Sequence, residues 1–395
     1  MDVDNEEKME TEEELVLDPK LDLARKLFLL RTEKLPNVDR SKIKDDILEL
    51  LIADKCVPLY ESYCEEFGWM VDETKLAEMN TSNEAELKQI EEKIADAIEN
   101  LGDSEVREGL LAKAEFYTRI GDREKATVAF KETEEKTTAV GQKIDTLFTA
   151  LRISFARSDM AAVKTELTKA KLLFEEGGDW ERKNRLKVYE GLYLMATRDL
   201  KKAANLFLDS IATFTATELC SYSTFIFYTV VTSMISLDRV TLKKRVIDAP
   251  EILTVIEEMP HLAVFLNSLY NCDYSKFFSA FVPVAEMVNS DMYLHAHYRY
   301  FLRSVRVVGY SQFLESYKSV TLDSMATAFG ISSEFLDKEL CSFISAGRLN
   351  CKIDKVLGVI ETNRPDAKNA LYQTTIKQGD LLLNRIQKLS KVIDF

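Results

Sequence analysis

The sequence predicts a mainly all-α protein: a solenoid of tetratricopeptide-like helical hairpins, then a winged-helix module with a small β-hairpin, then a C-terminal helix. Three observations predict it. The 395 residues include only 13 Gly and 7 Pro, about 5% of the chain against an average nearer 12%, which leaves few of the turns that sheets need. Capped apolar runs repeat through the middle of the chain. The pattern then changes after about residue 300.

The bulk composition limits the class of protein. Hydrophobic residues make up 46% and charged residues 30%, as in ordinary globular proteins, and the length predicts two or three structural units. No apolar stretch is long enough to cross a membrane, and the acidic start does not resemble a signal peptide. We therefore expect the protein in the cytoplasm and nucleus. The net charge of −14 disfavours membrane surfaces and nucleic acid, so protein partners are expected.

The N-terminal part divides into a tail and a helical region. Residues 1–18 are acidic and offer little to bury, which predicts a disordered tail. Residues 19–105 form an N-terminal helical region, because apolar residues recur there at steps of three and four. The clearest run is Leu87, Ile90, Ile94, Ala97, Ile98 and Leu101, with Glu and Lys between its members.

Residues 106–300 contain the repeat. Five turns each place an aspartate before a new apolar run, at Asp122, Asp159, Asp199, Asp238 and Asp273, spaced by 37, 40, 39 and 35 residues. The residues four positions further on are Ala126, Val163, Ala203, Leu242 and Phe277. Those eight positions further on are Phe130, Leu167, Phe207, Val246 and Phe281.

These spacings predict five helical hairpins. Aspartate is a favoured N-cap, and positions four and eight beyond it share one face of the helix that follows. A single hairpin cannot bury that face, so the units are expected to stack into a solenoid. The glycine typical of tetratricopeptide turns is present only at Gly121, which makes this a degenerate version of the repeat.

Residues 301–364 have the pattern of a winged helix. Helical runs at 305–320, 322–331 and 334–349 are followed by two short alternating segments, 348–354 and 357–363, joined by a tight connection around Lys355. Gly347 is expected to end the third helix. Three helices and a β-hairpin make up a winged helix, and this hairpin is the only β-structure that we expect in the chain.

Residues 365–395 are predicted to form a terminal helix that packs in a bundle with other chains. Leu382, Ile386, Leu389 and Ile393 lie along one seam, with Lys and Arg beside it. Gly379 weakens such a helix by roughly 1 kcal/mol when it stands alone. An apolar stripe without a home domain favours packing against helices of a partner.

The segment Ser316–Glu361 resembles the PCI family, which is named for the proteasome lid, the COP-nine signalosome and translation-initiation factor three. The resemblance rests on Met325, Ala326, Phe329 and Gly330, on the helix end Ala346-Gly347-Arg348-Leu349, and on the strand Lys352-Ile353-Asp354. With the repeats it covers roughly two thirds of the chain. It implies a helical-repeat arc ending in a winged helix whose edge strand pairs with that of a neighbour.

The resemblance also implies a function. We expect a non-catalytic structural subunit of the proteasome regulatory-particle lid, which serves ubiquitin-dependent protein degradation. Its partners would be other PCI subunits through winged-helix edges, a bundle of C-terminal helices, and the proteasome base. Two alternatives stay open: a PCI subunit of the signalosome, and an RNA-contacting subunit of a translation-initiation complex.

An exposed strand edge is a template for another chain's strand. The candidate interface residues in the wing are therefore Arg348, Cys351, Ile353 and Val359. For an RNA contact the candidates are Arg299, Arg303 and Arg306, which form a basic stripe. The third winged-helix helix is acidic by contrast, which disfavours approach to phosphates.

Catalytic and metal chemistry have little support in the sequence. His295 and His297 stand at i and i+2, which point apart on a helix, and no third zinc ligand is apparent. The only other histidine is His261. The cysteines, Cys56, Cys64, Cys220, Cys272, Cys341 and Cys351, are scattered and are expected to be reduced and mostly buried. No phosphate-binding loop is present, so we expect no enzyme, no cofactor and no metal.

Overall fold

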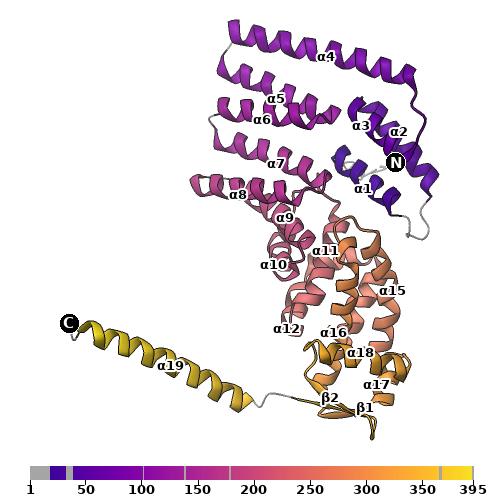
Figure 1. Ribbon diagram of the computed structural model, residues 1–395, viewed down its shortest axis with the longest axis vertical. Coiled ribbons are helices and arrows are strands. Elements are labelled where there is room, and N and C mark those ends of the chain that lie inside the picture. The colour runs from indigo at the N-terminus through magenta and orange to yellow at the C-terminus, as the bar shows by residue number, and fades with distance from the viewer. Residues whose placement is uncertain are drawn as a thin grey trace, which may run out of the picture. The chain divides into compact units, whose positions relative to one another are not determined.

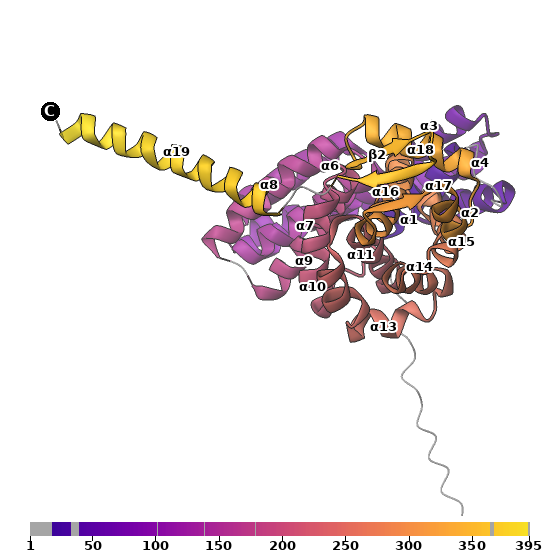
Figure 2. The same cartoon turned by 90° about the horizontal axis from the view of Figure 1, so that it is seen from below.

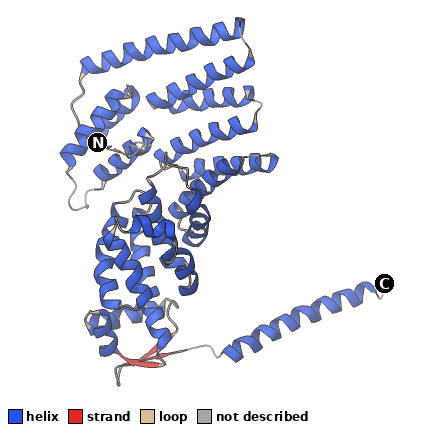
Figure 3. Cartoon of the chain, turned by 180° about the vertical axis from the view of Figure 1, so that it is seen from behind, coloured by secondary structure: helices blue, strands red, loops and turns tan. Residues whose placement is uncertain are grey.

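The computed structural model describes residues 18–32, 39–100, 102–137, 139–177, 179–363 and 367–393. These residues are mostly helical and contain one small three-stranded sheet (Figures 1 and 3). The predicted fold class is confirmed. The chain divides into two compact units, Met1–Leu266 with Phe281–Phe301, and Asn267–Ala280 with Leu302–Phe395. The acidic tail lies outside the described residues except for Asp18.

Four helices precede the repeat: α1 (Pro19–Arg31), α2 (Arg40–Ala53), α3 (Val57–Phe67) and α4 (Glu73–Asn100). Asp18 is the N-cap of α1, and its side chain accepts a hydrogen bond from the backbone N–H of Lys20 at 3.0 Å. Helix α3 ends at Gly68 in the left-handed conformation. Leu23, Ile47 and Tyr60 belong to the small core that these helices enclose.

The regular part of the repeat consists of three hairpins. They are formed by α5 (Asp103–Ile120) with α6 (Arg123–Lys136), α7 (Val140–Ala156) with α8 (Met160–Glu176), and α9 (Trp180–Ala196) with α10 (Leu200–Ser210). Helices α4 to α8 pack one against the next (Figure 1). Helices α9, α10 and α11 continue the series (Figure 2).

The aspartate caps form where the sequence predicts them. Asp122, Asp159, Asp199 and Asp238 are N-caps, and each side chain accepts from the backbone N–H three residues further on. Asp273 directly precedes α15, and its backbone carbonyl accepts from Phe277 N at 2.9 Å. Each of the five predicted turns is therefore followed by a new helix.

The predicted face is the buried face. All five residues four positions beyond the aspartates are buried, and so are four of the five residues eight positions beyond. The exception is Phe130, which is half-buried, while the neighbouring Ala129 is buried instead. The hairpins pack through the stripe that the spacing predicted.

The fourth and fifth hairpins are less regular. They contain α11 (Tyr222–Ser236), α12 (Arg239–Leu242), α13 (Pro250–Ile256), α14 (Pro260–Asn271) and α15 (Tyr274–Ser290), with a 3-10 turn at Ile211–Thr213. Helix α12 runs directly into a π-helical turn, Lys243–Ile247. The boundary between the two compact units falls inside α14 and α15, and also inside α16.

The winged-helix module contains α16 (Tyr298–Ser316), β1 (Ser319–Thr321), α17 (Leu322–Phe329), α18 (Ser333–Ser345), β2 (Cys351–Asp354) and β3 (Val359–Thr362). The expected helix over 305–320 is wrong at its end. The helix stops at Ser316, and Ser319–Thr321 forms a third strand that the sequence pattern did not predict. The wing, whose strands are red in Figure 3, is therefore an antiparallel sheet rather than a hairpin alone. Its strand order is β1-β3-β2.

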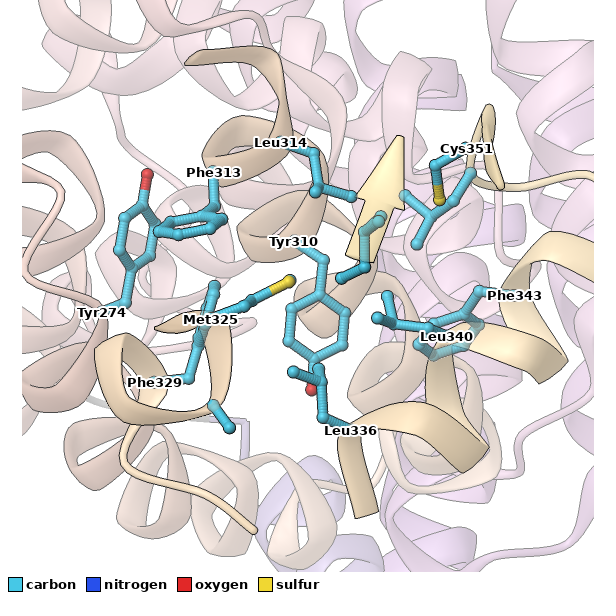
Figure 4. Packing of buried hydrophobic residues seen from close by; sticks show 13 residues of the cluster. Tyr274, Tyr310, Phe313, Leu314, Met325, Phe329, Leu336, Leu340, Phe343 and Cys351 are labelled. Carbon is cyan, nitrogen blue, oxygen red and sulfur yellow. The ribbon is translucent and has the colours of Figure 1, made fainter. Parts of the chain in front are cut away.

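The core of this module is aromatic and aliphatic. Tyr310 on α16 lies among Phe329, Leu336 and Phe343 (Figure 4), and all of them are buried. Tyr310 contacts Phe329 edge-on with 5.0 Å between ring centroids, a favoured aromatic geometry. Burial of such side chains is the main force that holds the three helices against the sheet.

The chain ends in α19 (Ala367–Ile393), the predicted terminal helix. Every α19 side chain whose exposure is described is exposed.

Candidate protein-interaction surfaces

The sheet has two outer strands, β1 and β2, because β3 lies between them. Asn363 N donates to Asn350 O at 2.9 Å, and this pair continues the β2–β3 register, in which Lys352 faces Glu361. Hydrogen-bonded and non-hydrogen-bonded pairs alternate in an antiparallel ladder. Cys351 and Ile353 therefore stand in non-hydrogen-bonded pairs, and their N–H and C=O groups point away from β3.

The wing residues singled out from the sequence have different environments. Ile353 is half-buried and packs against the module core, while Cys351 is 5% exposed and belongs to that core. Arg348 is exposed in the turn before β2. Val359 needs a correction as an edge residue: it pairs with Thr321 on one side and Asp354 on the other. It lies on the central strand, where the backbone is already occupied.

The other outer strand, β1, was not expected. It pairs with β3 through Ser319, Val320 and Thr321. Thr362 N donates to Lys318 O and Leu322 N donates to Gly358 O, so by the same alternation the backbone groups of Ser319 and Thr321 point outward. The β-branched pair Val320-Thr321 is the only sequence signal that favours a strand here, and three residues are too few to separate it from the preceding helical pattern.

Helix α19 carries a large apolar surface. The four seam residues are each more than half exposed: Leu382 60%, Ile386 54%, Leu389 61% and Ile393 72%. Further exposed apolar side chains on this helix are Leu371, Tyr372, Ile376, Leu381, Leu383 and Val392. Exposed apolar surface of this extent marks an interaction site. Residues 367–393 also include five basic and one acidic side chain, so acidic neighbours would complement it.

A partly buried polar cluster joins α16 to α18. Arg306 Nη1 lies 2.7 Å from Glu339 Oε1, and Tyr310 Oη donates to Glu339 Oε2 at 2.9 Å. Burial raises the pKa of Tyr310, and the neighbouring Glu339 raises it further. Arg306 is thereby committed to an ion pair inside the module. Of the basic stripe predicted for RNA, only Arg299 and Arg303 are exposed.

The histidine pair is engaged in packing. His295 Nδ1 lies 2.6 Å from Asn289 O, and His297 Nε2 lies 2.7 Å from Ala196 O. His295 also contacts Phe28 edge-on, with 5.2 Å between ring centroids. Among the described residues no group of three or more His, Cys, Asp or Glu side chains could hold a metal ion.

The six cysteines are free, as predicted. Four are buried, Cys341 is partly exposed and Cys272 is exposed. Burial raises the pKa of Cys56 to about 11 and that of Cys220 to about 12, so these two thiols are protonated at neutral pH and poorly nucleophilic.

In the part of the chain that the structure describes, no helix is both long and apolar enough to cross a membrane.

Helical hairpins followed by a winged helix, whose sheet has β1 and β2 as outer strands, define a PCI-class protein. The family description "PCI domain" matches residues 283–364. The description "26S proteasome subunit RPN7" matches residues 72–245, and that of the RPN7/PSMD6 C-terminal helix matches residues 372–393. The 26S proteasome non-ATPase regulatory subunit 6 homolog of Arabidopsis thaliana is 59% identical over 376 residues, which are 95% of this chain and 97% of that protein. The chain belongs to the family of 26S proteasome regulatory subunit RPN7, also called non-ATPase regulatory subunit 6.

More distant relatives distinguish the proteasome family from the signalosome. The Dictyostelium discoideum 26S proteasome non-ATPase regulatory subunit 6 is 48% identical over 376 residues, 95% of this chain and 98% of that protein. Subunit 1 of the COP9 signalosome complex from Arabidopsis thaliana is only 26% identical over 148 residues, 38% of this chain and 34% of that protein. The similarity favours the proteasome family over the signalosome.

Proposed function

We propose that this chain is a non-catalytic structural subunit of the lid of the 26S proteasome regulatory particle. It would work in the cytoplasm and nucleus and scaffold the assembly that degrades ubiquitin-tagged proteins. Family membership supports the assignment of this chain to the 26S proteasome. The free β2 edge is the single structural observation that carries the mechanism, because its outward N–H and C=O groups at Cys351 and Ile353 accept a strand of another subunit without disturbing β3.

A second contact element supports the same proposal. The exposed seam of α19 has the apolar residues and the spacing of a helix that packs among other helices. One subunit would then offer a strand edge and a bundle helix to its neighbours, and contacts with the proteasome base would follow from that assembly. An RNA contact is the weaker candidate, since Arg306 is held by Glu339.

The strand-pairing proposal is tested at Ile353. Ile353→Pro removes an N–H that points away from β3, so the hydrogen bonds of Lys352 and Asp354 to β3 remain. The matched control is Ile353→Ala, which loses the same contact with the core but keeps the N–H. Losing one interface hydrogen bond costs about 1–1.5 kcal/mol, so the proline variant is expected to bind its neighbour roughly fivefold to tenfold more weakly than the alanine variant.

Reconstitution of the regulatory particle from recombinant subunits gives the measurement, with incorporation titrated against subunit concentration. Both variants must first show the same melting temperature. If the folded proline and alanine variants are incorporated equally, strand addition at β2 is refuted.

A further inference from the structure

The connection between β2 and β3 presents two consecutive aliphatic side chains to solvent. Val356 is 93% exposed and Leu357 is 72% exposed. Turns of this kind usually contain Gly, Asn, Asp or Ser, which have a conformational reason to be there. The wing tip, which we define as Asp354–Gly358, instead carries apolar side chains that contribute nothing to the core of its own module.

The wing tip is held in one conformation. Asp354 Oδ1 accepts from the backbone N–H groups of Val356 at 2.9 Å and Leu357 at 3.2 Å. Gly358 has a φ of 63°, and its carbonyl accepts from Leu322 N at 2.9 Å. Lys355 Nζ lies 3.1 Å from Asp337 Oδ2 on α18. A preorganised tip loses little conformational entropy when it binds, so its apolar contacts count almost fully toward affinity.

The charges identify the kind of partner. Asp354 is engaged by two backbone N–H groups, and Lys355 is paired with Asp337. Residues 302–363 carry seven basic and seven acidic side chains, so the module has no net attraction for phosphates or for an anionic membrane. Two aliphatic side chains whose charged neighbours are already hydrogen-bonded or ion-paired within the module fit an apolar pocket on a protein.

The position of the tip indicates which protein. Val356 follows Ile353 by three residues, and a strand rises about 3.3 Å per residue. A chain that pairs with the outward groups of Ile353 therefore passes within about 10 Å of Val356. The tip is continuous with the edge proposed for strand addition and would contact the same neighbour.

We propose that the wing tip is a docking element that inserts Val356 and Leu357 into an apolar pocket of the subunit whose strand pairs with β2. This inference rests on the proposed function and extends it, because it adds a side-chain contact that selects the neighbour. Backbone pairing alone does not depend on the side chains of the partner, so a strand edge discriminates poorly between partners. Two aliphatic anchors at its end supply that discrimination.

Photo-crosslinking in the reconstituted regulatory particle tests the inference. Benzoylphenylalanine is placed at Val356 in one full-length variant and at Lys352, an exposed residue of β2, in another. We expect both positions to crosslink to the same subunit, and the adducts from position 356 to lie on apolar side chains. Crosslinks from 356 to a different subunit, or none while 352 crosslinks, would overturn the inference and leave strand pairing intact. No crosslink from 352 to any subunit would instead refute the strand pairing at β2 on which the inference rests.

Substitution gives an independent measurement. The double variant Val356→Ser, Leu357→Ser should keep the melting temperature of the unchanged chain, since both side chains are exposed. Its association with the crosslinked neighbour should be about tenfold weaker or worse. The control Val356→Ile, Leu357→Met keeps apolar side chains and should bind within about twofold of the unchanged chain. Unchanged binding of a folded serine variant would contradict the inference.

Discussion

The residue before the capping aspartate has the same backbone conformation in most of the five turns. Gly121 has a φ of 91°, and the residues in the same place before Asp159, Asp199 and Asp273 are also left-handed, although none is glycine: Ser158, Arg198 and Cys272 have φ values of 56°, 69° and 63°. Leu237, before Asp238, is extended instead. Four of the five turns therefore share one backbone conformation that only one of them shows by residue type.

A non-glycine residue held in the left-handed conformation costs roughly 1–2 kcal/mol. Replacing Ser158 by glycine is therefore expected to stabilise the folded protein. Ser158→Gly relieves this strain, and the greater freedom of glycine in the unfolded chain offsets part of the gain. We expect a net stabilisation of about 0.5–1 kcal/mol in urea unfolding. Lys164→Gly, at an exposed site inside α8, is the matched control and should destabilise by about 1 kcal/mol.

A loss of stability in Ser158→Gly as large as that in Lys164→Gly would show that the left-handed turn stores no strain.

The same turns show what a sequence conveys at this scale. The aspartate caps and the buried residues four and eight positions later follow from residue type and spacing. The structure confirms four of the five side-chain caps, all five buried residues four positions later and four of the five residues eight positions later. The left-handed conformation of Ser158 and Cys272 does not follow, because Ser and Cys seldom adopt it and the surrounding hairpin imposes it. Judged by its glycines, the repeat is therefore more degenerate than the backbone conformation of its turns shows.

At the scale of elements, local pattern predicted the helices and the wing hairpin but not the sheet. Strand β1 has three residues and directly precedes α17, so its side chains show no alternation that could be recognised. Its partner β3 lies 40 residues away along the chain from Val320 to Ile360. Pairing over that distance depends on the folded module, and the sequence therefore misplaced Val359 at an edge.

Helix α19 is the element whose role is easiest to isolate. The triple variant Leu382→Ser, Ile386→Ser, Leu389→Ser removes the centre of its seam. We expect incorporation into the regulatory particle to fall at least tenfold, since burying each such side chain contributes about 1.5–3 kcal/mol. The melting temperature of the isolated subunit should not change, because all three side chains are exposed there. Reconstitution with purified subunits gives both readings.

The control is Lys377→Ser, Asn384→Ser, Lys388→Ser, which lie on the opposite face of the helix and are also exposed. Similar incorporation of the two triple variants would mean that the seam is not what the bundle recognises.

At the scale of the whole molecule, packed helical hairpins precede a winged helix and a terminal helix, which expose three candidate contact surfaces. The hairpins bury the faces that their spacing predicted, and the winged helix buries an aromatic core around Tyr310. The β2 edge, the wing tip and the α19 seam are the surfaces that we propose for binding other chains. These three surfaces, together with the family membership, support the proposal that the protein acts as a structural subunit.

The composition of the native complex tests that account most directly. The full-length chain, tagged at its N-terminus so that α19 stays free, is purified from cells at physiological salt and weighed by native mass spectrometry with identification of its companions. We predict a particle that contains the other regulatory-particle subunits of the 26S proteasome and incorporates the ATPase base. Recovery of signalosome subunits instead, or of a free chain of 45.1 kDa, would contradict it.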